Sequence, residues 1–420
     1  MIILIIKNIL FRKEMNKNQQ ILPIFDSIEY VDNQDNFAHL TADYNIEDVK
    51  QGQMFLKSYK GSTGTFNSYR RELERLLQWS SLIAKKSLKD LKRNDIEDYV
   101  EFCRKPSKAW IGTKKHSRFT TQDSVRIANP QWKPFIVTIS KVQNRQGEKV
   151  SLKNFEFTQT ALKQLFAIVG SFYEYLLQEE HVFINPIKMI RQKSRYIQKI
   201  QGKTKIRRLS ELQWQYVIEV TKELAEQSPK FHERTLFILS ALYSMYLRIS
   251  ELAASKRWTP KMNDFARDND NNWWFTTVGK GNKQRQIAVS DTMLKALKRW
   301  RQYLKLPSLP SISEDNVLIP KMLGKGPVSC TSSIRYIVQN CFDQAVIKLK
   351  EDGFLEEAES LIAATVHWLR HTGISDDVKI RPREHVRDDA GHSSSAITDK
   401  YIDIELRERH RSARKKTIEM

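Results

Sequence analysis

Apolar residues recur at steps of three or four along three stretches in the first half of the chain, which predicts amphipathic helices. The first stretch covers residues 65–82, the second begins at Asn94, and the third covers residues 160–178. Glu97 follows Asn94 by three positions, the spacing of a capping box. We therefore expect a compact helical domain over residues 55–187.

The second half of the chain alternates helical and strand patterns. Ser210 and Gln213 predict a capping box at the start of a helix, and an uncharged stretch over residues 235–247 predicts a buried one. The apolar run at 273–278, the turn at 279–282 and the run at 286–289 predict a β-hairpin. Further helices are predicted at residues 291–304, 332–349 and 355–371. The expected fold class is mainly α, in which a mixed α/β, mostly helical domain with a small antiparallel sheet covers residues 210–420.

An insertion interrupts the first helical domain at about residues 105–154. It is rich in Lys and Arg, and four aromatic residues are interleaved among them: Trp110, Phe119, Trp132 and Phe135. Basic residues with aromatics can contact a nucleic-acid backbone. An equally good interpretation is a solvated loop whose aromatic side chains pack back on the domain.

The N-terminal extension, residues 1–54, has an unusual charge pattern. Between Asn18 and Val49 there is no Lys or Arg, whereas acidic residues accumulate. We expect this partly acidic extension not to bind DNA, and to be flexible or bound to a partner. The apolar run at its start is broken at Lys7, so it is too short to span a bilayer.

The composition points to a polyanionic partner. The chain has 420 residues, with 70 Lys+Arg against 49 Asp+Glu and a formal net charge of +21, so nucleic acid is favoured over a membrane. The 3 cysteines lack the spacing of a disulfide framework or a structural zinc site. We expect a reducing compartment, the cytoplasm, and no membrane association.

The sharpest change in composition lies between the two predicted domains. Residues 181–210 contain no Asp or Glu, and a run of like charge stays extended unless a polyanion neutralises it. We interpret residues 188–209 as a basic linker that lies along DNA phosphates, with a merely solvated tether as the alternative. The predicted DNA-binding residues are Lys188, Arg191, Lys193, Arg195, Lys199, Lys203, Lys205, Arg207 and Arg208.

Chemistry-bearing residues occur at separate places in the predicted second domain: Arg248, Lys280, His367, Arg370, His392 and Tyr401. Two guanidinium groups match the oxygens of one phosphodiester, which suits Arg248 and Arg370. A histidine can take the proton of a tyrosine hydroxyl, and a lysine of lowered pKa can protonate a departing sugar hydroxyl. The set predicts phosphoryl transfer to Tyr401 without a metal or other cofactor, because arginine and lysine supply the positive charge.

Each of these residues also has an ordinary structural interpretation. Arg248 can simply pair with Glu251, Lys280 can be a turn residue, and His367 with His371 has the i, i+4 spacing of a metal-binding pair. A His-Glu-x-x-His metalloprotease helix is excluded, because Trp368 stands where the glutamate is needed. Singly, each residue is more often structural than catalytic.

Together and in this order, the residues resemble the tyrosine recombinase (phage integrase) family. The matching segments lie between Thr65 and the end of the chain: 247–252 (LRISEL), 279–283 (GKGNK), 367–372 (HWLRHT), 391–392 (GH) and Tyr401, nine residues after His392. All six catalytic positions match, so the resemblance is highly specific.

The resemblance implies a helical core-binding domain and a catalytic domain that together clamp double-stranded DNA at a recombination site. Tyr401 would form a 3′-phosphotyrosine and release a 5′-hydroxyl, with strand exchange through a Holliday junction in a tetramer. The counterpart of Lys280 protonates the leaving 5′-oxygen. The counterpart of His367 assists proton transfer with the tyrosine, and that of His392 hydrogen-bonds the scissile phosphate. The implied role is integration or transposition of a mobile element.

The chain departs from the family pattern at several points. Tyr246 stands where a glycine commonly precedes Leu-Arg, and residues 373–390 are more charged than the usual apolar helix. The extension at residues 1–54 is acidic, so binding of arm-type sites is not expected. The tail at residues 407–416 either packs on a neighbouring protomer, as in the family, or is a frayed charged end.

Two other functions remain as alternatives. A type IB topoisomerase shares the phosphotyrosine chemistry but differs in the motifs around the lysine and the second histidine. A DNA-binding accessory factor derived from the same fold would need no chemistry, although the six intact positions argue against it.

Overall fold

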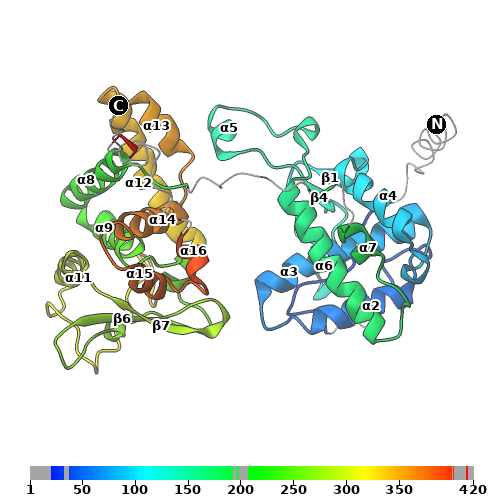
Figure 1. The fold of residues 1–420 in the computed structure, drawn as a ribbon, viewed down its shortest axis with the longest axis horizontal. Helices are drawn as coiled ribbons and strands as arrows, with labels where there is room; N and C mark the ends of the chain where they lie inside the picture. The colour runs from blue at the N-terminus through cyan, green and yellow to red at the C-terminus, as the bar shows by residue number, and fades with distance from the viewer. Residues whose placement is uncertain are drawn as a thin grey trace, which may run out of the picture. The chain divides into compact units, whose positions relative to one another are not determined.

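The computed structural model describes residues 20–32, 37–192, 196–197, 207–399, 401 and 413–414. The chain divides into two compact units, Met1–Gly202 and Lys203–Met420 (Figure 1). No helix among the residues described is long and apolar enough to cross a membrane. Each unit has its own hydrophobic core and is described by itself below.

The first unit is a helical domain with two small β-ladders. Its two ladders pair β1 with β4 in parallel and β2 with β3 in antiparallel orientation. The elements are α2 (Ile46–Lys57), α3 (Thr63–Trp79), α4 (Arg93–Arg104), β1 (Ile111–Gly112), β2 (Phe119–Gln122), β3 (Val125–Ala128), β4 (Phe135–Ile136), α5 (Lys141–Arg145), α6 (Gln159–Gln178) and α7 (Pro186–Gln192).

The three helices expected in this unit are confirmed as α3, α4 and α6, whose apolar stripes meet in one core. A π-helical turn at Ser80–Ala84 extends α3, and Lys85 ends it in the left-handed conformation. The expected cap of α4 is wrong. The helix begins at Arg93, and the Asp95 carboxylate accepts a hydrogen bond of 2.8 Å from the Lys92 backbone N–H.

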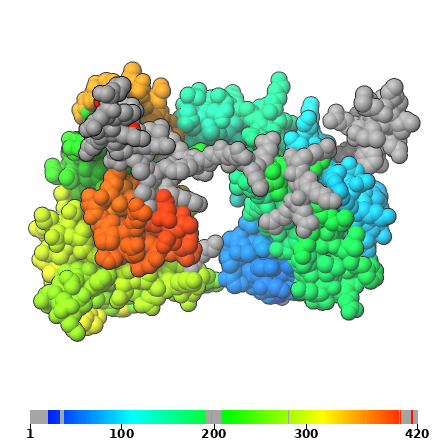
Figure 2. Space-filling view, in the orientation of Figure 1, coloured from blue at the N-terminus to red at the C-terminus, as the bar shows by residue number. Residues whose placement is uncertain are grey.

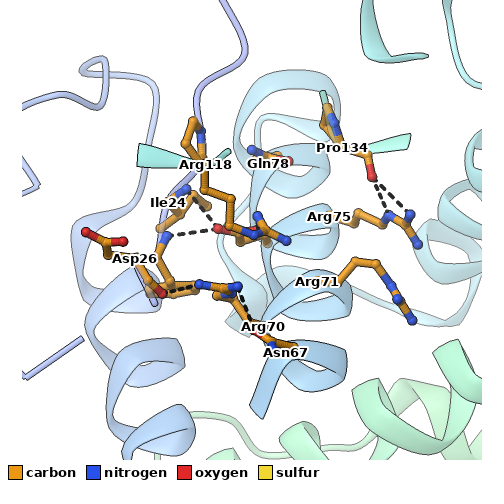
Figure 3. Close-up of polar contacts among 12 residues, drawn as sticks. Ile24, Asp26, Asn67, Arg70, Arg71, Arg75, Gln78, Arg118 and Pro134 are labelled. Carbon is orange, nitrogen blue, oxygen red and sulfur yellow. Dashed lines mark hydrogen bonds and ion pairs between the residues drawn. The ribbon is translucent and has the colours of Figure 1, made fainter. Parts of the chain in front are cut away.

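The aromatic residues of the basic insertion pack back on the domain. Trp110 and Phe135 are fully buried, and Trp132 and Phe119 are nearly so. The Arg75 guanidinium of α3 lies over the Phe135 ring at 4.3 Å and donates to the Pro134 carbonyl oxygen (Figure 3). These four aromatics therefore serve the core, which favours the second interpretation of the insertion.

The expectation that residues 1–54 are a flexible extension is wrong for the residues described. Ile24 and Phe25 are fully buried in the core, and their backbone N–H groups donate to the buried Glu74 carboxylate at 3.1 and 2.9 Å. Asp26 forms two hydrogen bonds with Arg126, at 2.6 and 2.8 Å, and its carbonyl oxygen accepts from Arg70 (Figure 3). Asp26 thus ties the N-terminal segment to α3 and to the basic insertion. Residues 1–19 and 33–36 lie outside the described part.

The basic segment at residues 188–209 is not a linker along its whole length. Its first residues belong to α7, whose Ile187 and Ile190 side chains are buried in the first core. The division between the two units falls at Gly202 and Lys203. Residues 193–195 and 198–206 lie outside the described part.

The second unit is mostly helical and holds one antiparallel sheet of order β5-β6-β7. The central helix α9 packs against α8, α11, α12 and α14. The elements are α8 (Glu211–Gln227), α9 (Pro229–Ser244), α10 (Ile249–Leu252), β5 (Phe265–Arg267), β6 (Trp273–Val278), β7 (Gln284–Ala288), α11 (Asp291–Tyr303), α12 (Thr331–Glu351), α13 (Leu355–Ile362), α14 (Val366–Asp377), α15 (Arg383–Ala390) and α16 (Ser395–Asp399).

Most expectations for this unit are confirmed. Ser210 and Gln213 form the capping box of α8, with hydrogen bonds of 3.0 and 3.1 Å, and the hairpin pairs β6 with β7. The single helix expected over residues 355–371 is wrong, because α13 and α14 are separate. Thr365 has an extended backbone (φ −126°, ψ 163°) and directly precedes α14. Neither proline nor glycine marks this break, and the one local signal is Thr365, a residue type that is common just before a helix.

Candidate active site

Arg248 and the buried Glu251 are hydrogen-bonded to each other in the candidate site. Arg248 directly precedes α10, and its backbone N–H donates to one Glu251 carboxylate oxygen at 2.8 Å. Its guanidinium donates to the other oxygen at 3.0 Å and to the Gly391 carbonyl at 3.5 Å. The pairing with Glu251 does occur, but the Arg248 side chain keeps 32% exposure, so part of the guanidinium faces solvent.

A second arginine, Arg285 on β7, holds the same carboxylate. Its two terminal nitrogens lie 2.7 and 2.8 Å from the two oxygens of Glu251, and its Nε donates to the Asp389 carbonyl at 3.0 Å. Burial alone would raise the pKa of Glu251, but Arg285 and Arg248 hold it below its ordinary value. The carboxylate stays ionised beneath Arg248 as a result.

Arg370 lies on α14 and is only 3% exposed. Its guanidinium donates to the carbonyl oxygens of Tyr246 and Ala390, the latter at 2.5 Å. Burial, followed by the charge of Arg248, lowers the pKa of Arg370 to about 9, so it remains charged at neutral pH. Because Arg370 and Arg248 donate to the adjacent carbonyls of Ala390 and Gly391, the two cations meet at one turn.

The backbone around Arg370 explains two unusual residues. Tyr246 has φ 50°, a conformation that favours glycine, and its buried ring directs the hydroxyl to Asp377 and Arg381. A glycine would adopt this left-handed backbone without the steric cost that a side chain brings. Gly373 needs to be glycine because a Cβ there would overlap with the Tyr243 carbonyl of α9. The close contact fixes α14 on α9.

The charged residues between Gly373 and Ala390 form a network of ion pairs and hydrogen bonds. Arg381 pairs with Asp377 at 3.2 Å and with Asp389 at 2.6 Å, which ties α14 to α15. The Tyr243 hydroxyl donates to Asp376 at 3.0 Å. These pairs stabilise the turn that carries His392.

Gly391 and His392 follow α15 directly. Gly391 has φ 63°, and a Cβ there would lie 2.9 Å from Cδ of Arg285, so both the backbone conformation and the space require glycine. His392 Nδ1 lies 2.9 Å from the Thr398 hydroxyl. Burial, followed by the charges of Arg370 and Arg248, lowers the pKa of His392 to about 4, so the imidazole is neutral near pH 7.

Tyr401 completes the site. Its ring stacks on that of His392, with centroids 5.7 Å apart and an interplanar angle of 18°. Its hydroxyl oxygen lies 2.5 Å from Nδ1 of His371. Burial raises the pKa of Tyr401, and the charges of Arg370 and Arg248 oppose that rise. Helices α14, α15 and α16, which carry His371 and flank His392 and Tyr401, form a continuous part of the surface of the second unit (orange to red in Figure 2).

Among the side chains that the structure describes, His367 is not seen in contact with Tyr401. His367 is exposed in the first turn of α14, and its ring centroid lies 4.5 Å from that of His371. The contact with the Tyr401 hydroxyl comes from His371, whereas the sequence resemblance implied His367. Lys280 lies in the turn Lys280–Asn282 between β6 and β7, and its side chain is outside the described part. The residues described include no group of His, Cys, Asp or Glu that could hold a metal.

No family model matches the chain, and no curated protein matches it. Several solved structures are similar. A lambda integrase dimer bound to a COC′ core site has 12% identity and a TM-score of 0.49, covering 88% of this chain and 79% of that chain. The XerH site-specific recombinase bound to palindromic difH substrate has 14% identity and a TM-score of 0.49, covering 92% of each chain. The Tn1549 transposon integrase in complex with a circular intermediate DNA has 13% identity and a TM-score of 0.48, covering 87% and 98%. At such identities and TM-scores, the case for a function rests on the residues of this chain.

The predicted DNA-binding residues are only partly described. Lys188 pairs with Glu174 at 2.9 Å, and Arg208 with Asp376 at 3.5 Å, so a phosphate would compete with a carboxylate for each. Arg207 is exposed. The side chain of Arg191 and the residues Lys193, Arg195, Lys199, Lys203 and Lys205 lie outside the described part.

Two site residues escaped the sequence analysis as functional groups. Arg285 occupies the same face of β7 as the buried Ile287, and a basic residue on the inward face of a strand was a usable signal. His371 was weighed only as half of a metal pair with His367. Its spacing from His367 predicts a shared helix face but not the contact with Tyr401, because that contact joins α14 to a residue beyond α16.

Proposed function

We propose that this protein is a tyrosine recombinase that cuts and rejoins DNA through a covalent 3′-phosphotyrosine. The observation that carries the proposal is the meeting of Arg248, Arg370, His392 and Tyr401, which are up to 153 positions apart in the chain, at one turn of the second unit. Two guanidinium groups that are charged at neutral pH, near a tyrosine hydroxyl, form a site for a phosphodiester and its nucleophile.

The proposed reaction is a transesterification. The Tyr401 oxygen forms a bond to phosphorus as the bond from phosphorus to the 5′-oxygen breaks, so no nucleotide or redox partner is needed. Negative charge that develops on the non-bridging oxygens is stabilised by Arg248 and Arg370, which are held in place before DNA arrives. His392, neutral and beside Tyr401, is the proposed hydrogen-bond donor to the phosphate. We keep Lys280 as the proposed acid for the 5′-oxygen. His367 precedes Arg370 by one helical turn, so we propose it as a further phosphate ligand in place of the proton-transfer role that the resemblance implied.

Glu251 and the backbone carbonyls supply the positioning that such a site requires. Glu251 holds Arg248 through two hydrogen bonds, and Tyr246 and Ala390 hold Arg370 through their carbonyl oxygens. Fixed donors stabilise a transition state better than mobile ones, because little reorganisation is required during the reaction. The hydrogen bonds that hold the two arginines therefore support a catalytic site over a surface that only binds DNA.

The wider setting of the reaction is part of the same proposal. We propose that the substrate is double-stranded DNA that carries a recombination site. We also propose that the protein acts as a tetramer and that it serves a mobile genetic element. We propose the cytoplasm as the compartment. Cys103, Cys330 and Cys341 are all free thiols, which suits a reducing environment. The basic segment at residues 188–209 is proposed to contact phosphates.

Trapping the covalent intermediate tests the proposal. The substrate is a pool of random-sequence DNA duplexes, each with a nick near the centre. Cleavage close to the nick releases a short strand, and the protein cannot rejoin the DNA once that strand has diffused away. The protein should form adducts that survive denaturation, and sequencing of the captured DNA should give one site. If DNA is bound but no adduct forms with any duplex, the protein is the accessory factor and not an enzyme. Adducts without sequence preference, together with relaxation of supercoiled DNA, would favour the topoisomerase.

A further inference from the structure

We propose that His371 is a catalytic residue, the acceptor of the Tyr401 hydroxyl proton when the nucleophile attacks. The proposal rests on the recombinase function above and assigns a step that the expected catalytic set gave to His367. His371 Nδ1 lies 2.5 Å from the Tyr401 oxygen, which is hydrogen-bonding distance. A candidate base must first be within reach of the proton that it removes, and His371 meets that condition.

The other two histidines of the site are less suited to this role. His392 stacks on the Tyr401 ring, and its Nδ1 is already engaged by the Thr398 hydroxyl at 2.9 Å. His367 is exposed, and its ring meets the edge of His371 at 73°. Among the described residues, only His371 is seen to contact the hydroxyl.

The backbone holds His371 in a fixed relation to the phosphate site. It directly follows Arg370, whose buried guanidinium is tied to two carbonyl oxygens, and it lies two residues before Gly373, where α14 touches α9. A phosphate held by Arg370 would therefore lie at a set distance from the base. Such positioning is what an attack in line with the leaving oxygen requires.

The electrostatics make the base respond to the substrate. Burial, followed by the charges of His367 and Arg370, lowers the pKa of His371 to about 4, so the imidazole is neutral and can accept a proton. A bound phosphodiester brings a negative charge that offsets Arg370 and Arg248, which raises the basicity of His371. The base is thus strengthened only when DNA occupies the site.

The proton balance of the step is complete. The Tyr401 O–H bond breaks and a bond from hydrogen to Nδ1 forms, while the tyrosine oxygen bonds to phosphorus and the 5′-oxygen leaves with a proton from Lys280. His371 needs the tautomer that carries hydrogen on Nε2. During rejoining, His371 returns the proton to the departing tyrosine oxygen, and Lys280 takes a proton from the attacking 5′-hydroxyl.

Single-turnover adduct formation on the duplex recovered from the random pool tests this assignment. Two versions of the duplex are compared, one with the ordinary 5′-oxygen and one with sulfur at that bridging position. A thiolate leaves without protonation, so the sulfur duplex removes the need for an acid but not for a base. The variants are His371→Ala, His371→Asn and Lys280→Ala, with His385→Ala, an exposed histidine of α15, as the control.

We expect His371→Ala to slow adduct formation about 100-fold or more on both duplexes, since general-base catalysis contributes about that much. The remaining rate should rise with pH, because solvent must now take the proton. Lys280→Ala should be slow on the oxygen duplex and largely restored on the sulfur duplex. His371→Asn, whose amide lies near the position of Nδ1, should retain the fold and the contact but show the same rise with pH. The His385→Ala control should match wild type.

A wild-type rate and pH profile in either His371 variant, with wild-type DNA affinity, would overturn the assignment and leave the recombinase function intact. Recovery of His371→Ala on the sulfur duplex would also overturn it, because the residue would then act on the leaving group. Failure of the wild-type protein to form any adduct would refute the recombinase function itself. If His371→Ala does not fold, the Asn variant decides between these outcomes.

Discussion

Arg285 and Glu251 form a bidentate ion pair in the second unit, with both nitrogen–oxygen distances below 3 Å (2.7 and 2.8 Å). The pair joins β7 to α10, and the same Glu251 carboxylate holds Arg248. Arg285 also donates to the Asp389 carbonyl, next to the turn that carries His392. One guanidinium thus positions two separate parts of the site without facing the phosphate itself.

Arg285→Lys is expected to reduce adduct formation while leaving DNA affinity within about threefold. Lysine cannot make the two parallel hydrogen bonds, so Glu251 loses one partner and Arg248 loses its fixed position. The loss of one buried charge-assisted hydrogen bond costs about 1–3 kcal/mol, which corresponds to roughly tenfold or more in rate. The loss is measured as the single-turnover rate of adduct formation on the duplex recovered from the random pool.

The matched control for this prediction is Arg299→Lys. Arg299 also makes a multiple contact with a glutamate, Glu233, but it joins α11 to α9, away from the site. Its rate should stay at the wild-type value. Equal rates for the two variants would show that Arg285 contributes no more to the site than an ordinary ion pair.

The salt dependence of DNA binding tests the basic segment at residues 188–209. Replacing Lys199, Lys203, Lys205 and Arg207 with alanine should reduce the slope of log affinity against log salt by about 1 for each lost phosphate contact. Lys348→Ala on α12, a surface lysine paired with Asp352, should leave the slope unchanged. A slope that stays constant in the fourfold variant would remove this segment from the DNA interface.

The two half-buried histidines of the site predict how stability depends on pH. His371 and His392 have pKa values of about 4 in the folded protein against 6.5 as the ordinary value, through burial and the nearby charges of His367, Arg370, Arg248 and Arg285. Between these values the unfolded chain binds more protons than the folded one. The free energy of unfolding therefore falls as pH decreases from about 6.5 to 4, by up to about 1.4 kcal/mol per pH unit for each histidine.

Comparison of wild type with a His371→Asn, His392→Asn variant isolates this effect, because other groups titrate in the same window. Asp264, whose pKa burial raises to about 6, opposes the trend in both proteins. Denaturant unfolding between pH 4 and 7 should give a steeper acid loss of stability in wild type than in the variant. Parallel curves would mean that the two histidines are not buried in neutral form.

Much of the molecule follows from its sequence, and the reason is that helices, hairpins and caps are local. The 3.6-residue periodicity of α3 and α6, the capping box at Ser210, and the hairpin that carries Lys280 all depend on neighbours in the chain. The motif order singled out Arg248, Arg370, His392 and Tyr401, which the structure brings together.

The remaining features depend on contacts between distant residues. Glu74 and Ile24 are 50 positions apart, Arg285 and Glu251 are 34 apart, and Tyr401 and His371 are 30 apart. The acidic N-terminal segment is predicted to be flexible from its sequence, because the residues that it contacts, such as Arg126, lie in another part of the chain. No glycine or proline marks the break before α14, and Thr365 alone is a weak sign of a helix start.

The tie between Glu74 and the N-terminal segment is testable by hydrogen exchange. Glu74→Gln removes the charge that faces Arg118 and weakens the acceptor for the Ile24 and Phe25 amides. Breaking a buried pair of this kind costs about 3–5 kcal/mol, so both amides should exchange faster and the first unit should melt earlier. Glu101→Gln, which affects an exposed pair with Arg104, is the control. Unchanged protection would show that the segment is held by its apolar side chains alone.

The central claim is that Tyr401 is the nucleophile of a DNA strand transferase. Removing only its hydroxyl in Tyr401→Phe keeps the ring that stacks on His392 and should leave DNA affinity nearly unchanged. Tyr216→Phe removes a surface hydroxyl that donates to Asp352 and is the matched control.

The decisive measurement is the amount of denaturation-resistant protein–DNA adduct on the nicked duplex pool. We predict adducts with wild type and with Tyr216→Phe and none with Tyr401→Phe, together with a peptide from wild type in which Tyr401 carries the 3′-phosphate of the cut strand. Adducts at the wild-type level in Tyr401→Phe would contradict the account.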